Sequence, residues 1–141
     1  MSLIFWDSML FIYLIEEQKE FCGRVIEIRE RMLTRKDRLC TSAFTLGELL
    51  AAPYSQNDLR LATVYRNALS QPQVETIPFT DETAEHFARI RVDRSISPAD
   101  AIQLACAAQA GVDLFLTNDR RLVRKAVRGI QFIADLSFDY F

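Results

Sequence analysis

The 141-residue sequence is short of histidine, cysteine and glycine, and each shortage argues against a class of protein. Its single histidine, His86, excludes two-histidine nucleases and histidine-rich zinc sites, and it gives little support to a Ser-His-Asp triad. Three cysteines (Cys22, Cys40 and Cys106) form no C-x-x-C pair, so we expect free thiols in helices or a core strand. The four glycines supply neither G-x-G-x-x-G nor a P-loop, which makes a nucleotide-binding fold of those types a poor fit.

Long apolar runs are missing as well. No stretch reaches the roughly 20 apolar residues of a membrane span, and the N-terminus lacks the basic start and cleavage site of a signal peptide. We therefore expect a soluble cytoplasmic protein without membrane contact, folded as one domain over residues 1–141. The formal charge of −2 argues against a protein that simply coats nucleic acid. The stretch 120–128 nevertheless contains five basic residues and no acid.

Short apolar segments alternate with helical patterns along the whole chain, which predicts an α/β protein. Such strands are typical of a parallel sheet that is covered on both faces. The expected strands span residues 3–6, 38–42, 74–79, 112–117 and 130–134. The expected helices span residues 8–17, 20–33, 44–52, 57–70, 81–93, 98–110 and 119–127, and Pro53 is expected to end the third of them.

Four acids lie just after a strand or early in the helix that follows it. They are Asp7, Glu48, Asp100 and Asp119. Because ligands bind beyond the carboxyl ends of parallel strands, these side chains can converge at one edge of the sheet. Each acid has an alternative role in capping its own helix, and "TLGE" (45–48) and "SPAD" (97–100) both match the capping-box pattern. Four capping acids would have no reason to gather in one place, so the cluster favours a shared cation.

An all-oxygen site without histidine or cysteine selects hard cations such as Mg²⁺ or Mn²⁺. The chemistry that such a cluster serves best is phosphodiester hydrolysis. A bound metal ion lowers the pKa of its water and stabilises the charge of the transition state. The residues alone therefore suggest a metal-dependent hydrolase that acts on phosphodiesters.

The stretches "FWDSMLFIYLIE", "FTLGELL", "SPADAIQLACA" and "LFLTNDRRL" resemble the motifs of PIN domains. The chain is most similar to the VapC-type ribonuclease toxins of toxin–antitoxin pairs, and the four motifs occur in the family's order. This resemblance implies an α/β/α sandwich with a central parallel sheet of four or five strands. It also implies an RNA substrate, a cognate antitoxin and a homodimer.

The resemblance assigns roles to individual residues. It implies that the four acids form the Mg²⁺ (or Mn²⁺) site and are the catalytic residues, with Asp7 and Asp100 as the most direct ligands. Ser8 and Thr117 match hydroxyl positions that hold the carboxylates or a metal-bound water, and Asn118 would shape the loop. Met9 departs from the family, which usually has a small polar residue there. Four arginines would hold the RNA backbone, namely Arg94, Arg120, Arg121 and Arg124.

Two hypotheses remain in competition. The leading one is a metal-dependent endoribonuclease, the toxin of a toxin–antitoxin pair, that cuts single-stranded or loop RNA. The alternative is a catalytically silent PIN-like module that binds RNA or a protein. The intact set of four acids favours the enzyme.

Overall fold

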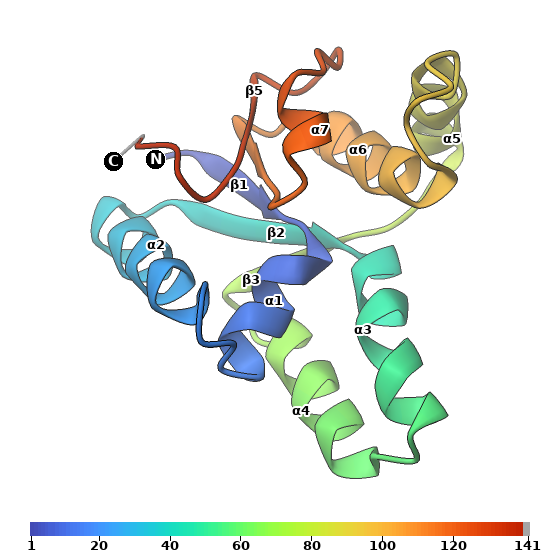
Figure 1. Ribbon diagram of the computed structural model, residues 1–141. Helices are drawn as coiled ribbons and strands as arrows, with labels where there is room; N and C mark the ends of the chain where they lie inside the picture. Colours follow the sequence, from blue (N-terminus) through green and yellow to red (C-terminus); the bar gives the residue numbers. More distant parts are fainter. Residues whose placement is uncertain (140–141) are drawn as a thin grey trace.

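The computed structural model describes residues 1–139 and contains a five-stranded parallel sheet (Figure 1). All four pairs of neighbouring strands are parallel, and the strand order is β3-β2-β1-β4-β5. The strands are β1 (Leu3–Trp6), β2 (Arg38–Ser42), β3 (Val74–Ile77), β4 (Leu114–Leu116) and β5 (Phe132–Ala134). The expected parallel sheet of four or five strands is confirmed.

Helices cover both faces of this sheet, as expected for an α/β/α sandwich. They are α1 (Ser8–Ile15), α2 (Cys22–Arg35), α3 (Ala43–Ser55), α4 (Leu59–Leu69), α5 (Asp81–Ile90), α6 (Pro98–Ala110) and α7 (Arg120–Val123). Within the described residues, none of these helices is long and apolar enough to cross a membrane.

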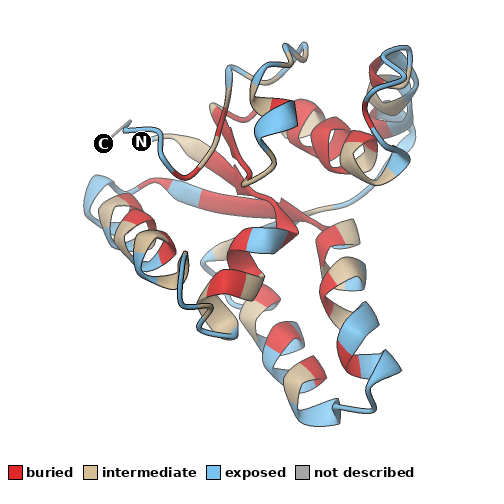
Figure 2. Cartoon of the chain, in the orientation of Figure 1, coloured by how far each residue is buried: buried red, intermediate tan, exposed pale blue. Residues whose placement is uncertain are grey.

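Successive side chains of β1 point into two separate cores, because side chains alternate along a strand. Ile4 and Trp6 belong to the core under α1, α2 and α4. Phe5 lies in the second core, where its ring stacks on Phe115 of β4 beneath α6. The buried residues in Figure 2 follow these two layers on either side of the sheet.

The strands are shorter than expected in three places. The expected strands 74–79, 112–117 and 130–134 are observed as Val74–Ile77, Leu114–Leu116 and Phe132–Ala134. Thr117 still pairs through its backbone N–H with the carbonyl of Ala134, at 3.0 Å. Its hydroxyl, however, already belongs to the loop that follows β4.

Several helix boundaries also differ from the expected ones. Helix α3 contains Pro53 and ends at Ser55, so the prediction that Pro53 ends it was wrong. Proline removes one hydrogen bond of the helix, but the ring is buried and its carbonyl accepts the backbone N–H of Asp58 at 2.7 Å. Helix α5 ends at Ile90 rather than 93, and α7 covers only Arg120–Val123 of the expected 119–127. Helix α1 (Ser8–Ile15) ends two residues before its expected bound. Helix α2 (Cys22–Arg35) begins and ends two residues after its expected bounds.

The cysteines have the structural role that the sequence indicated, and two aromatic residues of α1 are structural as well. All three cysteines are free thiols, of which Cys40 and Cys106 are buried. Phe11 and Tyr13 are buried in the core rather than presented to a ligand.

Candidate functional site

Asp7 is a buried carboxylate at the carboxyl end of β1. It is the N-cap of α1 and is only 7% exposed. One oxygen accepts the backbone N–H of Ser8 at 2.8 Å, and the other accepts the Thr117 hydroxyl at 2.8 Å. Burial raises the pKa of Asp7, and the negative charge of Asp100 raises it further against these hydrogen bonds. The site therefore contains a buried carboxylate that a cation would stabilise.

Thr117 connects the ends of two strands. Its hydroxyl donates to Asp7 from β1 and accepts the backbone N–H of Asp119, at 3.0 Å, in the loop after β4. Thr117 is fully buried. This one hydroxyl therefore fixes the spacing of two of the predicted acids.

Glu48 reaches the same region from the second turn of α3. Its Oε1 accepts a hydrogen bond from Nε2 of Gln103, at 2.6 Å, and Gln103 lies on α6. Burial raises the pKa of Glu48, and the charges of Asp7 and Asp100 add to this effect. Helix α3 is capped by Ser42, not by Thr45, so the capping-box alternative for Glu48 was wrong.

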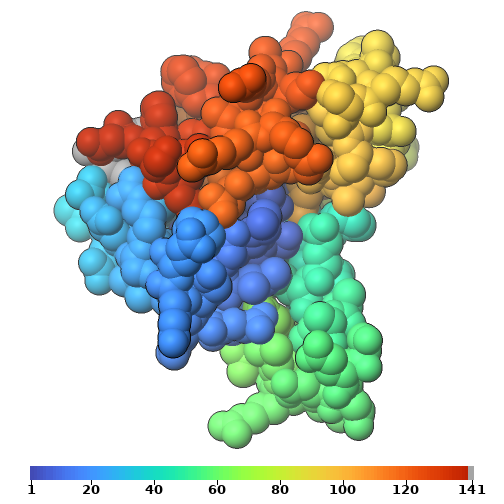
Figure 3. Space-filling model, viewed as in Figure 1, coloured from blue at the N-terminus to red at the C-terminus, as the bar shows by residue number. Residues whose placement is uncertain are grey.

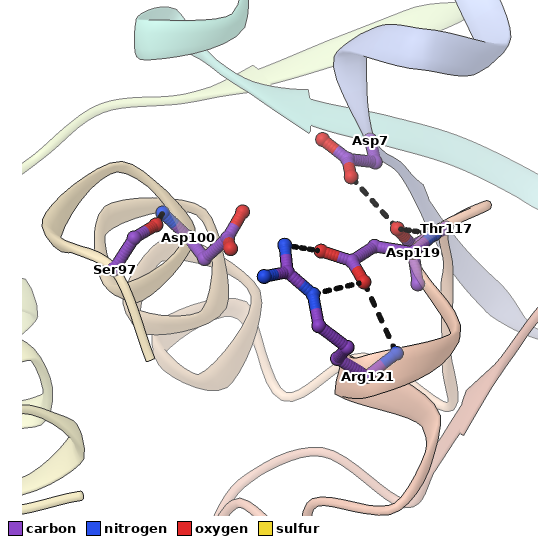
Figure 4. A network of polar contacts seen from close by, with 6 residues as sticks. All are labelled: Asp7, Ser97, Asp100, Thr117, Asp119 and Arg121. Atoms are coloured by element: carbon purple, nitrogen blue, oxygen red, sulfur yellow. Dashed lines mark hydrogen bonds and ion pairs between the residues drawn. The ribbon is translucent and has the colours of Figure 1, made fainter. Parts of the chain in front are cut away.

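Asp100 lies in the first turn of α6. Its backbone N–H is accepted by the Ser97 hydroxyl at 3.2 Å, so Ser97 is the N-cap that the sequence predicted. In Figure 4 the carboxylate of Asp100 points toward the space that Asp7 and Asp119 also face. Its charge raises the pKa values of Asp7 and Glu48, so Asp100 lies near both of them.

Asp119 is held by a neighbour in sequence. It caps α7 by accepting the backbone N–H of Arg121 at 3.0 Å, and it also accepts two bonds from the Arg121 guanidinium, at 3.0 and 2.8 Å. These bonds lower the pKa of Asp119. The guanidinium lies between Asp119 and Asp100 in Figure 4, and both acids raise the pKa of Arg121. The guanidinium of Arg121 is thus a positive group of the protein itself that lies among the acids.

The carboxylates of this site fit a hard divalent cation, but they do not form a complete coordination shell. Within residues 1–139, no three His, Cys, Asp or Glu side chains are close enough together to hold a metal ion directly. The donors are all carboxylates, which Mg²⁺ and Mn²⁺ prefer, and the charges of three of them oppose one another without a cation. Asp119 differs from the other acids because its carboxylate is already paired with a cation of the chain, the Arg121 guanidinium.

The comparison with protein families is decisive. Residues 4–128, which include all four acids, match the PIN domain family. The chain belongs to the PIN domain family. Among curated proteins, none matches this chain.

Solved structures of similar fold agree with this PIN assignment. A chain from the DNA-bound VapBC of Salmonella typhimurium is 26% identical with a TM-score of 0.73, and the match covers 96% of this chain and 99% of that one. VapBC2 from Rickettsia felis, bound to a DNA fragment from its promoter, gives a TM-score of 0.75 at 14% identity and covers 94% and 98%. VapC20 of Mycobacterium tuberculosis, described as a sarcin-ricin loop cleaving toxin, gives 0.63 at 20% identity and covers 79% and 86%.

The hydroxyl and amide residues predicted to support this PIN-domain site lie beside it. Ser8 is buried next to Asp7, and its hydroxyl lies 3.5 Å from the same carboxylate oxygen that its N–H contacts. Asn118 donates to the Tyr13 hydroxyl at 3.0 Å, which ties the loop after β4 to α1. Met9 is partly exposed and points no polar group at the site.

The four predicted RNA-binding arginines have different surroundings. A hollow of about 510 Å³, here called the acid hollow, is lined by Asp100 and Asp119 together with Arg120, Arg121 and Arg124. Arg94 lies in the loop before α6 and does not line it. Arg120 lies 3.8 Å from Asp135 and is 84% exposed. Three of the four arginines therefore adjoin the acids.

Sequence reasoning missed Gln103, which the structure places at the centre of a buried network. Gln103 is 2% exposed, and its amide nitrogen donates to Thr45 at 2.8 Å as well as to Glu48. Its amide oxygen accepts the hydroxyl of Ser42. The available signal was one polar residue three positions after Asp100, because residues i and i+3 share a helix face.

Proposed function

We propose that this PIN domain is a Mg²⁺- or Mn²⁺-dependent endoribonuclease that hydrolyses RNA phosphodiester bonds as the toxin of a toxin–antitoxin pair. The observation that carries the proposal is the gathering of Asp7, Glu48 and Asp100 at the carboxyl edge of the sheet, where the charge of Asp100 raises the pKa values of Asp7 and Glu48. Membership of the PIN family supports it, as does the fold shared with toxin chains.

Asp7 and Asp100 would be the direct ligands of the metal ion, assisted by Glu48 and Asp119. When bound, such an ion supplies Lewis-acid stabilisation and a water of lowered pKa. Thr117 holds the Asp7 carboxylate in one orientation through its hydroxyl, and Gln103 does the same for Glu48. Arg121 can exchange its contact with Asp119 for a phosphate oxygen, because guanidinium groups bind both anions bidentately.

The proposed partners follow from the structures that the chain resembles. The Salmonella typhimurium and Rickettsia felis proteins are VapBC complexes, and a related fold comes from a toxin–antitoxin complex of Klebsiella pneumoniae. An antitoxin is therefore the proposed protein partner, and a homodimer is the proposed assembly. RNA as the substrate makes the cytoplasm the proposed location.

Incubation of the purified protein with total RNA tests this function directly. Fragments should appear with Mn²⁺ or Mg²⁺ and not with EDTA, and mapping their 5′ ends should give defined sites. Asp7→Asn and Asp100→Asn should abolish cleavage. Asp81→Asn, which removes an exposed acid on α5, should retain it. Cleavage that survives in Asp7→Asn, or its absence with both metals, would refute the proposal.

One observation favours a second candidate, a catalytically silent module that binds RNA or a protein. Arg121 already neutralises Asp119 and faces Asp100, as a structural cation would. A silent module would bind RNA without producing fragments, and its RNA affinity would not depend on Mn²⁺. The same incubation, combined with a binding measurement, separates the two candidates.

A further inference from the structure

A second hollow adjoins the acid hollow. Its volume is about 590 Å³, and it is lined by residues of α5 and of the segment that follows α7. Arg124 and Lys125 line both hollows, so the two share a wall. Figure 3 shows the surfaces of the segments around residues 90 and 120 next to each other on this side of the molecule. The volume of this second hollow lies within the roughly 300–1,000 Å³ that ligand sites span.

Basic side chains dominate this second hollow. Its lining includes Arg89 and His86 from α5, and Arg124, Lys125 and Arg128 from the segment after α7. We call it the arginine hollow. It contains one acid, Asp93, whose carboxylate is engaged by the Lys125 ammonium at 2.9 Å. Over the described residues 1–139, the guanidinium groups of Arg89, Arg124 and Arg128 have no hydrogen bond or ion pair.

The segment after α7, which carries Arg124 and Arg128, is held close to α6. Gly129 has a φ of +99°, and a Cβ atom at this position would lie 2.8 Å from the carbonyl oxygen of Ala108. Only glycine permits this approach together with this backbone conformation. The backbone next to Arg128 is therefore packed closely against α6 by the chain itself.

We propose that the arginine hollow binds phosphates of the RNA strand on one side of the scissile bond. This inference rests on the proposed function, because it takes Asp100, the proposed metal ligand that lines the acid hollow, as marking the place where the strand is cut. A strand that extends from the acid hollow carries a phosphate on every nucleotide, and the adjoining surface offers unpaired guanidinium groups that bind phosphate bidentately. An acidic peptide would gain the same contacts but would have no reason to continue into a cluster of carboxylates.

Apart from Arg124, the basic residues of the arginine hollow differ from those predicted to bind RNA. Arg89, Arg128 and His86 lie outside the four arginines that the sequence indicated, and Arg94 lines neither hollow. Arg124 belongs to both hollows, so it would contact the phosphate that links them. The strand is thus expected to run from Asp100 past Arg124 toward Arg89.

Binding of labelled oligouridylate to a double variant, Arg89→Gln with Arg128→Gln, tests the proposal. Both proteins carry Asp7→Asn to prevent cleavage, and a matched double variant, Lys36→Gln with Arg60→Gln, removes the same charge from exposed positions of another surface. The Arg89→Gln, Arg128→Gln variant should bind an oligomer of about 12 nucleotides several-fold more weakly than the parent. The slope of the logarithm of its binding constant against the logarithm of the salt concentration should be less steep by about 1.4, the value for two lost phosphate contacts on a single strand. Binding of a uridylate dinucleotide should be unchanged.

Each other result overturns the inference. An equal loss of RNA affinity in the matched control would show a general effect of charge. An unchanged dependence of the binding constant on salt would show that Arg89 and Arg128 contact no phosphate. Displacement of the RNA by polyglutamate at equal concentration of charge would show a site for acidic protein instead. Because binding is measured without cleavage, failure here leaves the nuclease proposal intact. Absence of cleavage in the RNA incubation would leave this binding result standing.

Discussion

Replacement of Gln103 by leucine tests whether a buried amide holds Glu48 in place. Leucine is similar in size but removes the hydrogen bonds to Glu48, Thr45 and Ser42. A hydrogen bond to a charged group contributes about 1.5–3 kcal/mol, and a neutral one about 0.5–1.5 kcal/mol. Thr45 keeps its bond to Thr41, at 2.8 Å, so the neutral losses are partly compensated. We expect a loss of about 2–4 kcal/mol in the free energy of unfolding.

The chain provides a closely matched control on the same helix. Gln109 donates from its amide nitrogen to the carboxylate of Glu82 at 2.6 Å, the same distance as the bond from Gln103 to Glu48. The bond from Gln109, however, is exposed to solvent. Substitutions on the surface usually change stability by less than about 0.5 kcal/mol. Gln109→Leu should therefore be nearly neutral, and the difference between the two variants measures the effect of burial.

Urea or thermal unfolding followed by tryptophan fluorescence gives the measurement. Trp6 is the single tryptophan and is 1% exposed, so its emission reports loss of the core. For a chain of this size, the expected loss for Gln103→Leu corresponds to a decrease in Tm on the order of 5–15 °C. Equal stabilities of the Gln103 and Gln109 variants would show that the buried network does not hold Glu48, and the reasoning would be wrong.

Two further predictions concern the charges of the site. Burial raises the pKa of Asp7 in the folded protein above its unfolded value of about 3.8. Protonated Asp7 therefore contributes its full stability below the unfolded pKa, and this contribution is lost as pH rises through the folded pKa. Asp7→Asn cannot titrate and remains a good N-cap, so its stability relative to the parent should increase from pH 4 toward pH 7 in urea unfolding; a constant difference would contradict this. Arg121→Gln should tighten Mn²⁺ binding a few-fold in calorimetry, because the guanidinium no longer competes for Asp119. Arg120→Gln, equally exposed at 84%, should leave Mn²⁺ affinity unchanged, and equal effects of the two variants would refute the competition.

The sequence was sufficient for the sheet and for the region in which the acids meet. Strands 3–6 and 38–42 are flanked by clear turn and helix signals, and the structure has both with the same bounds. The edge strand β5 and the short helix α7 were overestimated in length, because apolar and basic periodicity continues past the point where hydrogen bonding stops. Once the strand and helix order was known, the approach of Asp7, Glu48 and Asp100 followed from the geometry of parallel strands.

Side-chain pairing within the site could not be read from the sequence. Arg121 was expected at the RNA backbone, yet it folds back on a residue only two positions away. Which anion an arginine contacts depends on its rotamer and on competing ligands, and neither is encoded in spacing. Gln103 was missed for a related reason, because burial on α6 depends on the position of α3, which sequence periodicity does not give.

The capping and metal-binding interpretations of Asp7 turn out to be compatible. Its Oδ1 caps α1 by accepting the Ser8 N–H, with the Ser8 hydroxyl 3.5 Å away, and its Oδ2 accepts the Thr117 hydroxyl. An ionised carboxylate has about four acceptor positions, which leaves Oδ2 with room for a cation. The two hydrogen bonds fix the orientation of the group before any ligand arrives, so binding would require no reorganisation of a buried side chain. Helix capping would therefore also prepare Asp7 for the proposed metal ion, and the gathering of Glu48 and Asp100 near it is the feature that capping alone does not explain.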